Sequence, residues 1–111
     1  MISVLIPCYD FDALPLVKKL EKEALVLGIP YEIICIDDGS FSLLNEKNQQ
    51  INALTNCQFI ESKKTVGSIA NRKLLSNKAQ YNWLIFIDVD TMPKNQKYLE
   101  NYITYINKSE V

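Results

Sequence analysis

Hydrophobic residues gather in four short runs, separated by stretches in which they recur every three or four positions. The runs cover residues 2–6, 31–36, 58–61 and 83–87, and their length and β-branched content predict buried strands. The run at 58–61 is the most mixed, which predicts a strand near a sheet edge. The run at 83–87 is the most apolar, which predicts a central strand.

The stretches between the runs predict helices. Residues 14–27 have apolar positions at helical spacing, with Asp12 as the N-cap and Gly28 as the stop. Residues 41–56 carry a weaker helical pattern. After residue 65 an apolar residue recurs every fourth position, which predicts a helix with Thr65 as its cap. The apolar stripe of this helix consists of Val66, Ala70 and Leu74, widened by Ile69, Leu75 and Ala79. A last helix is predicted after a cap at Asn95, with Leu99, Tyr102, Ile103 and Ile106 on one face.

Strands therefore alternate with helices along the chain. Parallel neighbouring strands need a crossover connection, and helices normally provide it. The order predicts one α/β domain over residues 1–111, with a Rossmann-like three-layer architecture in which helices cover both faces of a parallel sheet. In such sheets ligands bind beyond the carboxyl ends of the strands.

Polar clusters follow three of the predicted strands at this edge: Pro7–Asp10, Asp37–Ser40 and Asp88–Asp90. They contain five of the six aspartates of the chain, whose repulsion must be offset by a cation or by hydrogen-bond donors. Two carboxylates one residue apart suit Mg²⁺ or Mn²⁺, which leave coordination positions open for phosphate oxygens. Each cluster alone is also typical of turns and helix caps.

Composition narrows the chemistry. With 12 Lys plus Arg against 13 Asp plus Glu, the net charge of −1 argues against a nucleic-acid partner. The chain has no histidine, which excludes Ser-His-Asp catalysis and His-ligated zinc. Carboxylates, lysines and backbone dipoles remain, and these suit metal and phosphate chemistry.

The cysteines and the apolar runs bear on location. Cys8, Cys35 and Cys57 have no CxxC spacing, so we expect neither a disulfide framework nor a zinc site, and Cys35 is expected to be a small buried thiol. No apolar run approaches the ~18 residues that span a bilayer. We therefore expect a cytoplasmic protein, either free or at the membrane periphery.

Four segments together resemble the family 2 glycosyltransferases of the GT-A fold: Ser3–Asp10, Glu32–Ser40, Val66–Arg72 and Trp83–Asp90. The DDGS and DxD motifs at successive strand ends make the resemblance specific, and it spans essentially the whole chain. It implies the nucleotide-binding part of a truncated catalytic domain. Such a domain binds a nucleotide-diphosphate sugar, here UDP-linked, for transfer to a hydroxyl of a saccharide or lipid-linked acceptor.

The resemblance also implies roles for the first two clusters. Pro7 and Tyr9 match the segment that lies against the nucleotide base, with the Tyr9 ring stacked on it. Asp38 matches the acid that accepts a hydrogen bond from the base, whereas Asp37 is expected to hold the loop. Gly39 is expected where a side chain would obstruct a close approach.

Further roles are implied for the basic and acidic residues downstream. Arg72, the only arginine, matches an arginine near the nucleotide, although an ordinary exposed cation is the alternative; Lys73 replaces the asparagine usual after it. Asp88 is implied near the ribose or the metal. Asp90 is implied as a ligand of the Mg²⁺ or Mn²⁺ that holds the diphosphate. Thr91 stands where many relatives have another acid.

Enzymes of this family are longer, and their later segments form the acceptor site and supply a catalytic base. We therefore expect the base beyond Val111, an inactive isolated chain, and an apolar surface through which a homo-oligomer forms. Two other classes stay open. A receiver-like signalling module also gathers aspartates and a cation at strand ends, but its acidic pair follows the first strand. A non-catalytic assembly domain would keep only the fold.

Overall fold

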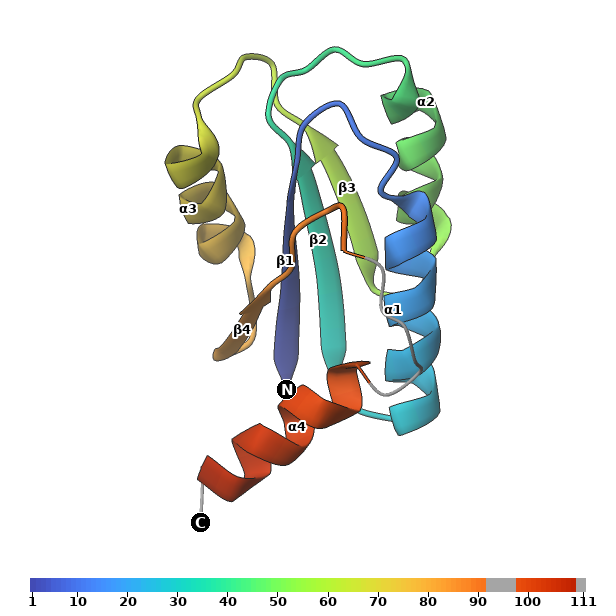
Figure 1. The fold of residues 1–111 in the computed structure, drawn as a ribbon, viewed down its shortest axis with the longest axis vertical. Helices are drawn as coiled ribbons and strands as arrows, with labels where there is room; N and C mark the ends of the chain where they lie inside the picture. Colours follow the sequence, from blue (N-terminus) through green and yellow to red (C-terminus); the bar gives the residue numbers. More distant parts are fainter. Residues whose placement is uncertain (92–97, 110–111) are drawn as a thin grey trace.

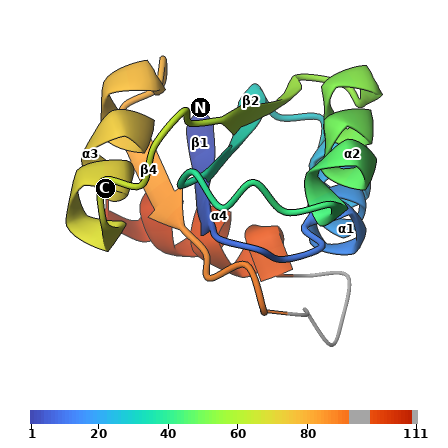
Figure 2. The same ribbon diagram turned by 90° about the horizontal axis from the view of Figure 1, so that it is seen from above.

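The computed structural model describes residues 1–91 and 98–109, which form a parallel sheet between layers of helices (Figure 1). The strands lie in the order β3-β2-β1-β4. Helices flank both faces of the sheet (Figure 2), which confirms the predicted α/β architecture. The strands are β1 (Ile2–Cys8), β2 (Tyr31–Asp37), β3 (Cys57–Glu61) and β4 (Trp83–Phe86). The helices are α1 (Leu14–Leu27), α2 (Leu44–Asn48), α3 (Ser68–Lys78) and α4 (Tyr98–Ser109), with the short 3-10 helix η1 (Gln49–Ala53) after α2.

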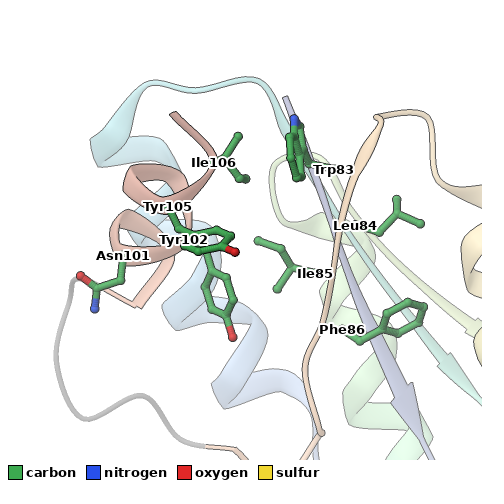
Figure 3. Close-up of a pocket in the computed structure, with 8 residues that line it drawn as sticks. All are labelled: Trp83, Leu84, Ile85, Phe86, Asn101, Tyr102, Tyr105 and Ile106. Carbon is green, nitrogen blue, oxygen red and sulfur yellow. The ribbon is translucent and has the colours of Figure 1, made fainter. Parts of the chain in front are cut away.

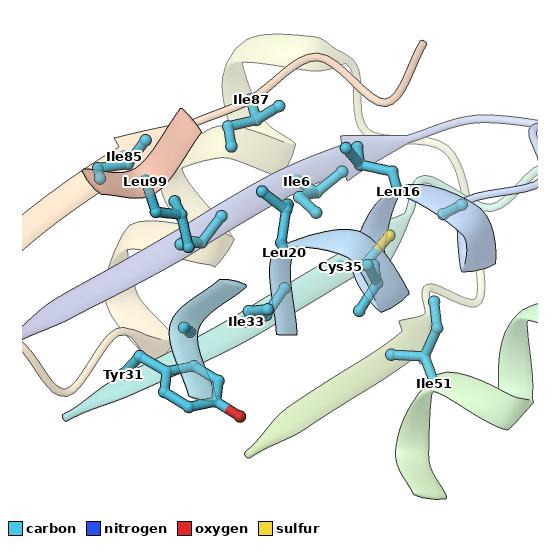
Figure 4. Close-up of a cluster of buried hydrophobic side chains, with 14 of the residues drawn as sticks. Ile6, Leu16, Leu20, Tyr31, Ile33, Cys35, Ile51, Ile85, Ile87 and Leu99 are labelled. Carbon is cyan, nitrogen blue, oxygen red and sulfur yellow. The ribbon is translucent and has the colours of Figure 1, made fainter. Parts of the chain in front are cut away.

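The core lies on both faces of β1 and β2. Alternate side chains of a strand point to opposite faces, so Val4 and Ile6 pack toward α1 whereas Leu5 packs toward α3. The larger cluster joins α1, α4 and η1 to the sheet (Figure 4). The smaller cluster contains Leu75 of α3. Burial on both faces explains why the first two strands are apolar throughout.

β1 continues through Pro7 to Cys8, beyond the end predicted for it. The backbone nitrogen of Ile87 donates to the carbonyl oxygen of Leu5. Because peptide groups alternate along a strand, those of Ser3, Leu5 and Pro7 face β4. The ladder with β4 ends at this bond. Pro7 therefore lies in a strand without removing a ladder hydrogen bond, because it stands where β4 has already left β1.

The two outer strands differ from each other in how well they match the prediction. β3 lies at an edge, as predicted. The expectation of a central position for residues 83–87 is wrong within the described chain, because β4 pairs only with β1 there and forms the other edge. Trp83 and Leu84 are 38% and 40% exposed. The most apolar run of the sequence is therefore an edge strand with partly exposed side chains within the described residues.

Neither α1 nor α3 begins at the cap residue predicted for it, and neither has a side-chain cap hydrogen bond. α1 has Ala13 at its N-cap, and Asp12 only accepts a 3.3 Å hydrogen bond from the nitrogen of Leu14. α3 begins after Gly67, so Thr65 does not cap it. Gly28 does end α1. The predicted cap Asn95 lies outside the described residues.

The buried face of α3 agrees with the predicted stripe at Leu75 but not at Val66 and Leu74. Asn71 and Leu75 are its buried residues, whereas Val66 and Leu74 are exposed. Asn71 donates through Nδ2 to the carbonyl oxygen of Ile36, so a polar contact fastens the helix to β2 and shifts its buried face away from the apolar repeat. In α4, Leu99 and Ile106 are buried as predicted, whereas Tyr102 is 40% exposed. Within residues 1–91 and 98–109 no helix is long and apolar enough to cross a membrane.

Candidate functional site

An open cleft of about 400 Å³ lies at the carboxyl edge of the sheet, where the ends of β1 and β4 meet the first turns of α3. It brings together four of the residues predicted from the sequence. These are Pro7, Arg72, Asp88 and Asp90. Phe11, Ser68 and Val89 complete the lining.

Arg72 extends from α3 toward the end of β4. Its Nη2 lies 3.7 Å from Oδ1 of Asp88, and its Cζ lies 5.2 Å from the centre of the Phe86 ring. The ring is close enough for a cation–π contact with the guanidinium. Both ends of the ion pair face solvent, with side chains 48% and 74% exposed, so the pair contributes little to stability. The guanidinium is therefore held at the cleft but remains accessible.

The donor set suits a cation that is completed by a ligand. Among the described residues no group of three or more His, Cys, Asp or Glu side chains could hold a metal by itself. Asp88 and Asp90 nevertheless line the same cleft. Mg²⁺ in phosphate-binding sites typically takes one or two carboxylates, several waters and phosphate oxygens. Two carboxylates in an open cleft fit this kind of site.

Asp37 organises the turn after β2. Its carboxylate accepts hydrogen bonds from the backbone nitrogen and Oγ of Ser40, at 2.9 and 2.7 Å, and from the nitrogen of Asp10 at 3.3 Å. The side chain is fully buried. Asp37 thus ties the loop after β2 to the loop after β1.

Asp38 fixes the entrance to α3. Its two carboxylate oxygens each accept a 2.9 Å hydrogen bond, one from the nitrogen of Val66 and one from the nitrogen of Gly67. Of the two ways expected to offset the crowded aspartates, hydrogen-bond donors therefore serve Asp37 and Asp38. Their buried charges therefore need no cation. Asp10 is exposed and does not line the cleft, so Asp88 and Asp90 are the aspartates that line it within residues 1–91 and 98–109.

Gly39 lies where the loop before α3 crosses the loop after β2. Its φ is +69°, and a Cβ at this position would lie 2.4 Å from the carbonyl carbon of Lys64. Both the conformation and the contact exclude a side chain. The DDGS motif is thus a clamp on the segment that leads into α3.

Tyr9 stands apart from the cleft. It lies just after β1, is 58% exposed, and does not belong to the cleft lining.

The sequence did not predict three residues at the site, Phe11, Ser68 and Phe86. Position gives a signal for two of them, since Phe11 follows the first cluster and Ser68 follows Gly67. The contact of Phe86 with Arg72 has no local signal, because it joins a strand to a helix.

None of the three cysteines lines the cleft. Cys35 is fully buried, as expected, and all three cysteines are free thiols. A hydrogen bond with Cys8, together with burial, raises the pKa of Cys35 well above its ordinary value. Cys35 is therefore a neutral thiol that acts as part of the core.

Solved structures share this fold. The structure of S. aureus TarS 1–349 superposes with a TM-score of 0.77 at 19% identity, covering 96% of this chain and 32% of that one. Its complex with UDP-GlcNAc gives a TM-score of 0.78 at 19% identity over 96% of this chain and 31% of the other. The complex with UDP gives 0.67 at 20% identity over 96% and 32%.

Sequence comparison identifies the family. No curated protein matches the chain. The model of glycosyl transferase family 2, by contrast, matches residues 3–111, which is nearly the whole sequence. The matched region contains the DDGS motif, Arg72 and the DxD motif at the edge of the sheet described above. The chain therefore belongs to glycosyltransferase family 2.

Proposed function

We propose that the cleft binds the diphosphate of a UDP-linked sugar. The observation that carries this proposal is the meeting of one guanidinium and two carboxylates, from Arg72, Asp88 and Asp90, in a single cleft. A guanidinium recognises phosphate oxygens through charge-assisted hydrogen bonds. S. aureus TarS, which shares the fold, has been solved with UDP-GlcNAc and with UDP, and this supports uridine as the nucleoside.

Asp90, together with Asp88, would hold the divalent cation, Mg²⁺ or Mn²⁺. When bound, the cation neutralises negative charge on the departing nucleoside diphosphate. Arg72 places a second positive charge in the same cleft. Ser68, at the first position of α3, adds a hydroxyl at the helix end whose dipole favours an anion.

The base would lie along the edge beside the cleft. Pro7 lines the cleft, and Tyr9, two residues further along the chain, has an exposed ring that is available for stacking. The carboxylate of Asp38 would accept a hydrogen bond from the imide N–H of the base. A carboxylate has about four lone-pair sites, so Asp38 can keep its bonds to Val66 and Gly67 while it accepts one more.

In the whole enzyme the sugar passes to a hydroxyl of a saccharide or lipid-linked acceptor. The chain spans 32% of TarS 1–349, and within residues 1–91 and 98–109 the cleft holds only Asp88 and Asp90 as carboxylates, both assigned to the cation. We expect the catalytic base beyond Val111 and little transfer by these residues alone. Membership in the family argues against a receiver-like module.

The uncovered edge of β4 is a proposed surface for self-association. The nitrogen of Ile87 donates to Leu5, and alternate residues of a strand direct their backbone groups to the same neighbour. The backbone groups of Leu84 and Phe86 therefore point away from β1. Beside this edge a groove of about 540 Å³ lies between β4 and α4, lined by Ile85, Tyr102 and other apolar residues (Figure 3). An apolar edge strand without charge or proline is a template for pairing with a second chain.

Titration calorimetry with UDP, GDP and CMP, each with and without Mn²⁺, tests the nucleotide proposal. We expect UDP to bind best and to need Mn²⁺. Asp90→Asn should lose the Mn²⁺-dependent part of the binding. Asp12→Asn is the matched control, because Asp12 is an aspartate outside the cleft lining that pairs with Lys47. Equal UDP binding by Asp90→Asn and the parent would remove Asp90 from the site.

A further inference from the structure

Arg72 makes two contacts of different kinds, a cation–π contact with Phe86 and an ion pair with Asp88. The Phe86 ring supports the guanidinium from β4, while the Asp88 carboxylate faces it at 3.7 Å. This separation is longer than a hydrogen bond, so the ion pair holds the arginine by charge alone. The ring contact is independent of that charge. Arg72 can therefore leave Asp88 without leaving the end of β4.

Asp88 is shared between the observed Arg72 guanidinium and the divalent cation of the proposed function. The same carboxylate lines the cleft with Asp90, where the proposed function places a divalent ion, and it also pairs with Arg72. A divalent ion at Asp88 lowers the negative charge that attracts the guanidinium, and it repels the guanidinium directly. The Arg72 pair and the metal thus oppose each other at one side chain.

We propose that Arg72 is the resident counter-ion of Asp88 and that the divalent cation displaces it. The inference rests on the proposed function. While the cleft is empty, Arg72 offsets the charge of Asp88 beside Asp90. When the cation takes over this role, the guanidinium turns on the Phe86 ring toward the diphosphate. Phe86 is then a positioning residue, since it acts only through Arg72.

The exchange predicts effects of opposite sign from one substitution. Arg72→Gln removes the competitor, so Mn²⁺ without nucleotide should bind about two- to fivefold more tightly, as expected for loss of one exposed ion pair. With Mn²⁺ saturating, the same variant should bind UDP about tenfold more weakly, because a charge-assisted hydrogen bond is lost. Electron paramagnetic resonance of free Mn²⁺ measures the first affinity, and calorimetry measures the second.

Lys73→Gln is the matched control for charge. Lys73 is the next residue of α3, is exposed, and loses the same single charge on substitution. We expect its Mn²⁺ affinity to equal that of the parent. In an Asp88→Asn background the gain from Arg72→Gln should vanish, because the shared carboxylate is gone. If the Mn²⁺ affinity rose as much in Lys73→Gln as in Arg72→Gln, the gain would be a general effect of charge, and the proposed exchange would be wrong.

Nuclear magnetic resonance gives a readout that does not require tight metal binding. The side-chain protons of Arg72 should carry a ring-current shift from Phe86, which Phe86→Leu identifies by removing it. Titration with Mg²⁺ should move the Arg72 Nε–H resonance in the parent and leave it unmoved in Asp88→Asn. An unmoved resonance in the parent, with Mg²⁺-dependent UDP binding intact, refutes the exchange alone. UDP binding that is independent of any divalent ion refutes the metal site and the exchange together.

Discussion

The carboxylate of Asp38 lies 2.9 Å from the backbone nitrogen of Gly67, the residue after which α3 begins. Its other oxygen accepts the nitrogen of Val66 at the same distance. The acid at the end of β2 therefore sets the position of the helix that carries Arg72. Loop geometry and the proposed phosphate contact depend on the same side chain.

Replacing Asp38 should cost stability as well as binding. Asp38→Ala leaves two partly buried N–H groups without their acceptor, so we expect the free energy of unfolding to fall by about 1–3 kcal/mol. Urea unfolding followed by circular dichroism measures the change. Asp88→Ala is the comparison, because its exposed carboxylate should change stability by less than about 0.5 kcal/mol. Equal midpoints for the two variants would contradict the anchoring role.

Gly39→Ala should disturb the same clamp from the other side. The added Cβ meets the backbone of Lys64 at 2.4 Å, and a left-handed φ costs an alanine roughly 1–2 kcal/mol before any collision. We expect Gly39→Ala to lower the free energy of unfolding by more than this amount and to weaken UDP binding. Gly28→Ala provides the control, since it shares the positive φ but has no atom within 4 Å of the new Cβ. If both variants lose the same stability, the close approach at Gly39 is unimportant.

Local pattern predicted the strands and the edge that holds the site, because burial on both faces leaves a continuous apolar run in β1 and β2. It failed where contacts between distant segments decide the outcome. The buried face of α3 follows the bond from Asn71 to Ile36, which no helical repeat encodes. The carboxylate of Asp38 turns inward because its donors, Val66 and Gly67, come from another loop, whereas Asp37 is held mainly by Ser40 of its own loop. Asp10 does not line the cleft either, so of the five aspartates at the strand ends only Asp88 and Asp90 line it within the described residues.

Alkaline pH should destabilise the fold through a buried tyrosine. Tyr31 donates from its hydroxyl to the carbonyl oxygen of Thr55 at 2.7 Å, and burial raises its pKa to about 12. Because the folded pKa exceeds the unfolded value of 10.0, the contribution of Tyr31 is complete below pH 10 and disappears as the pH rises toward 12. Burial likewise raises the pKa of Tyr98 and of Cys57 to about 12, which adds to the loss.

Urea midpoints at pH 8 and pH 11 test this linkage. Tyr31→Phe should be less stable than the parent at pH 8 by about 0.5–1.5 kcal/mol, because the hydrogen bond to Thr55 is lost. This difference in the free energy of unfolding should shrink at pH 11. At that pH the Tyr31 hydroxyl ionises readily in the unfolded parent but must stay protonated in the folded parent. Tyr9→Phe, at an exposed position, should follow the parent at both pH values. A constant gap between Tyr31→Phe and the parent would argue against the raised pKa.

A charge on the open edge of β4 should suppress self-association. Leu84 is 40% exposed, and its backbone groups point away from β1. Two copies joined antiparallel at this edge would pair Leu84 of each with Phe86 of the other and bring both apolar grooves to one interface. Leu84→Lys places a lysine where natural edge strands carry one to prevent such pairing.

Sedimentation velocity over a concentration series should show a dimer for the parent and a monomer for Leu84→Lys. Val26→Lys is the control, because Val26 is exposed on α1, away from β4. A monomeric parent, or a dimer that survives Leu84→Lys, would show that this edge does not pair.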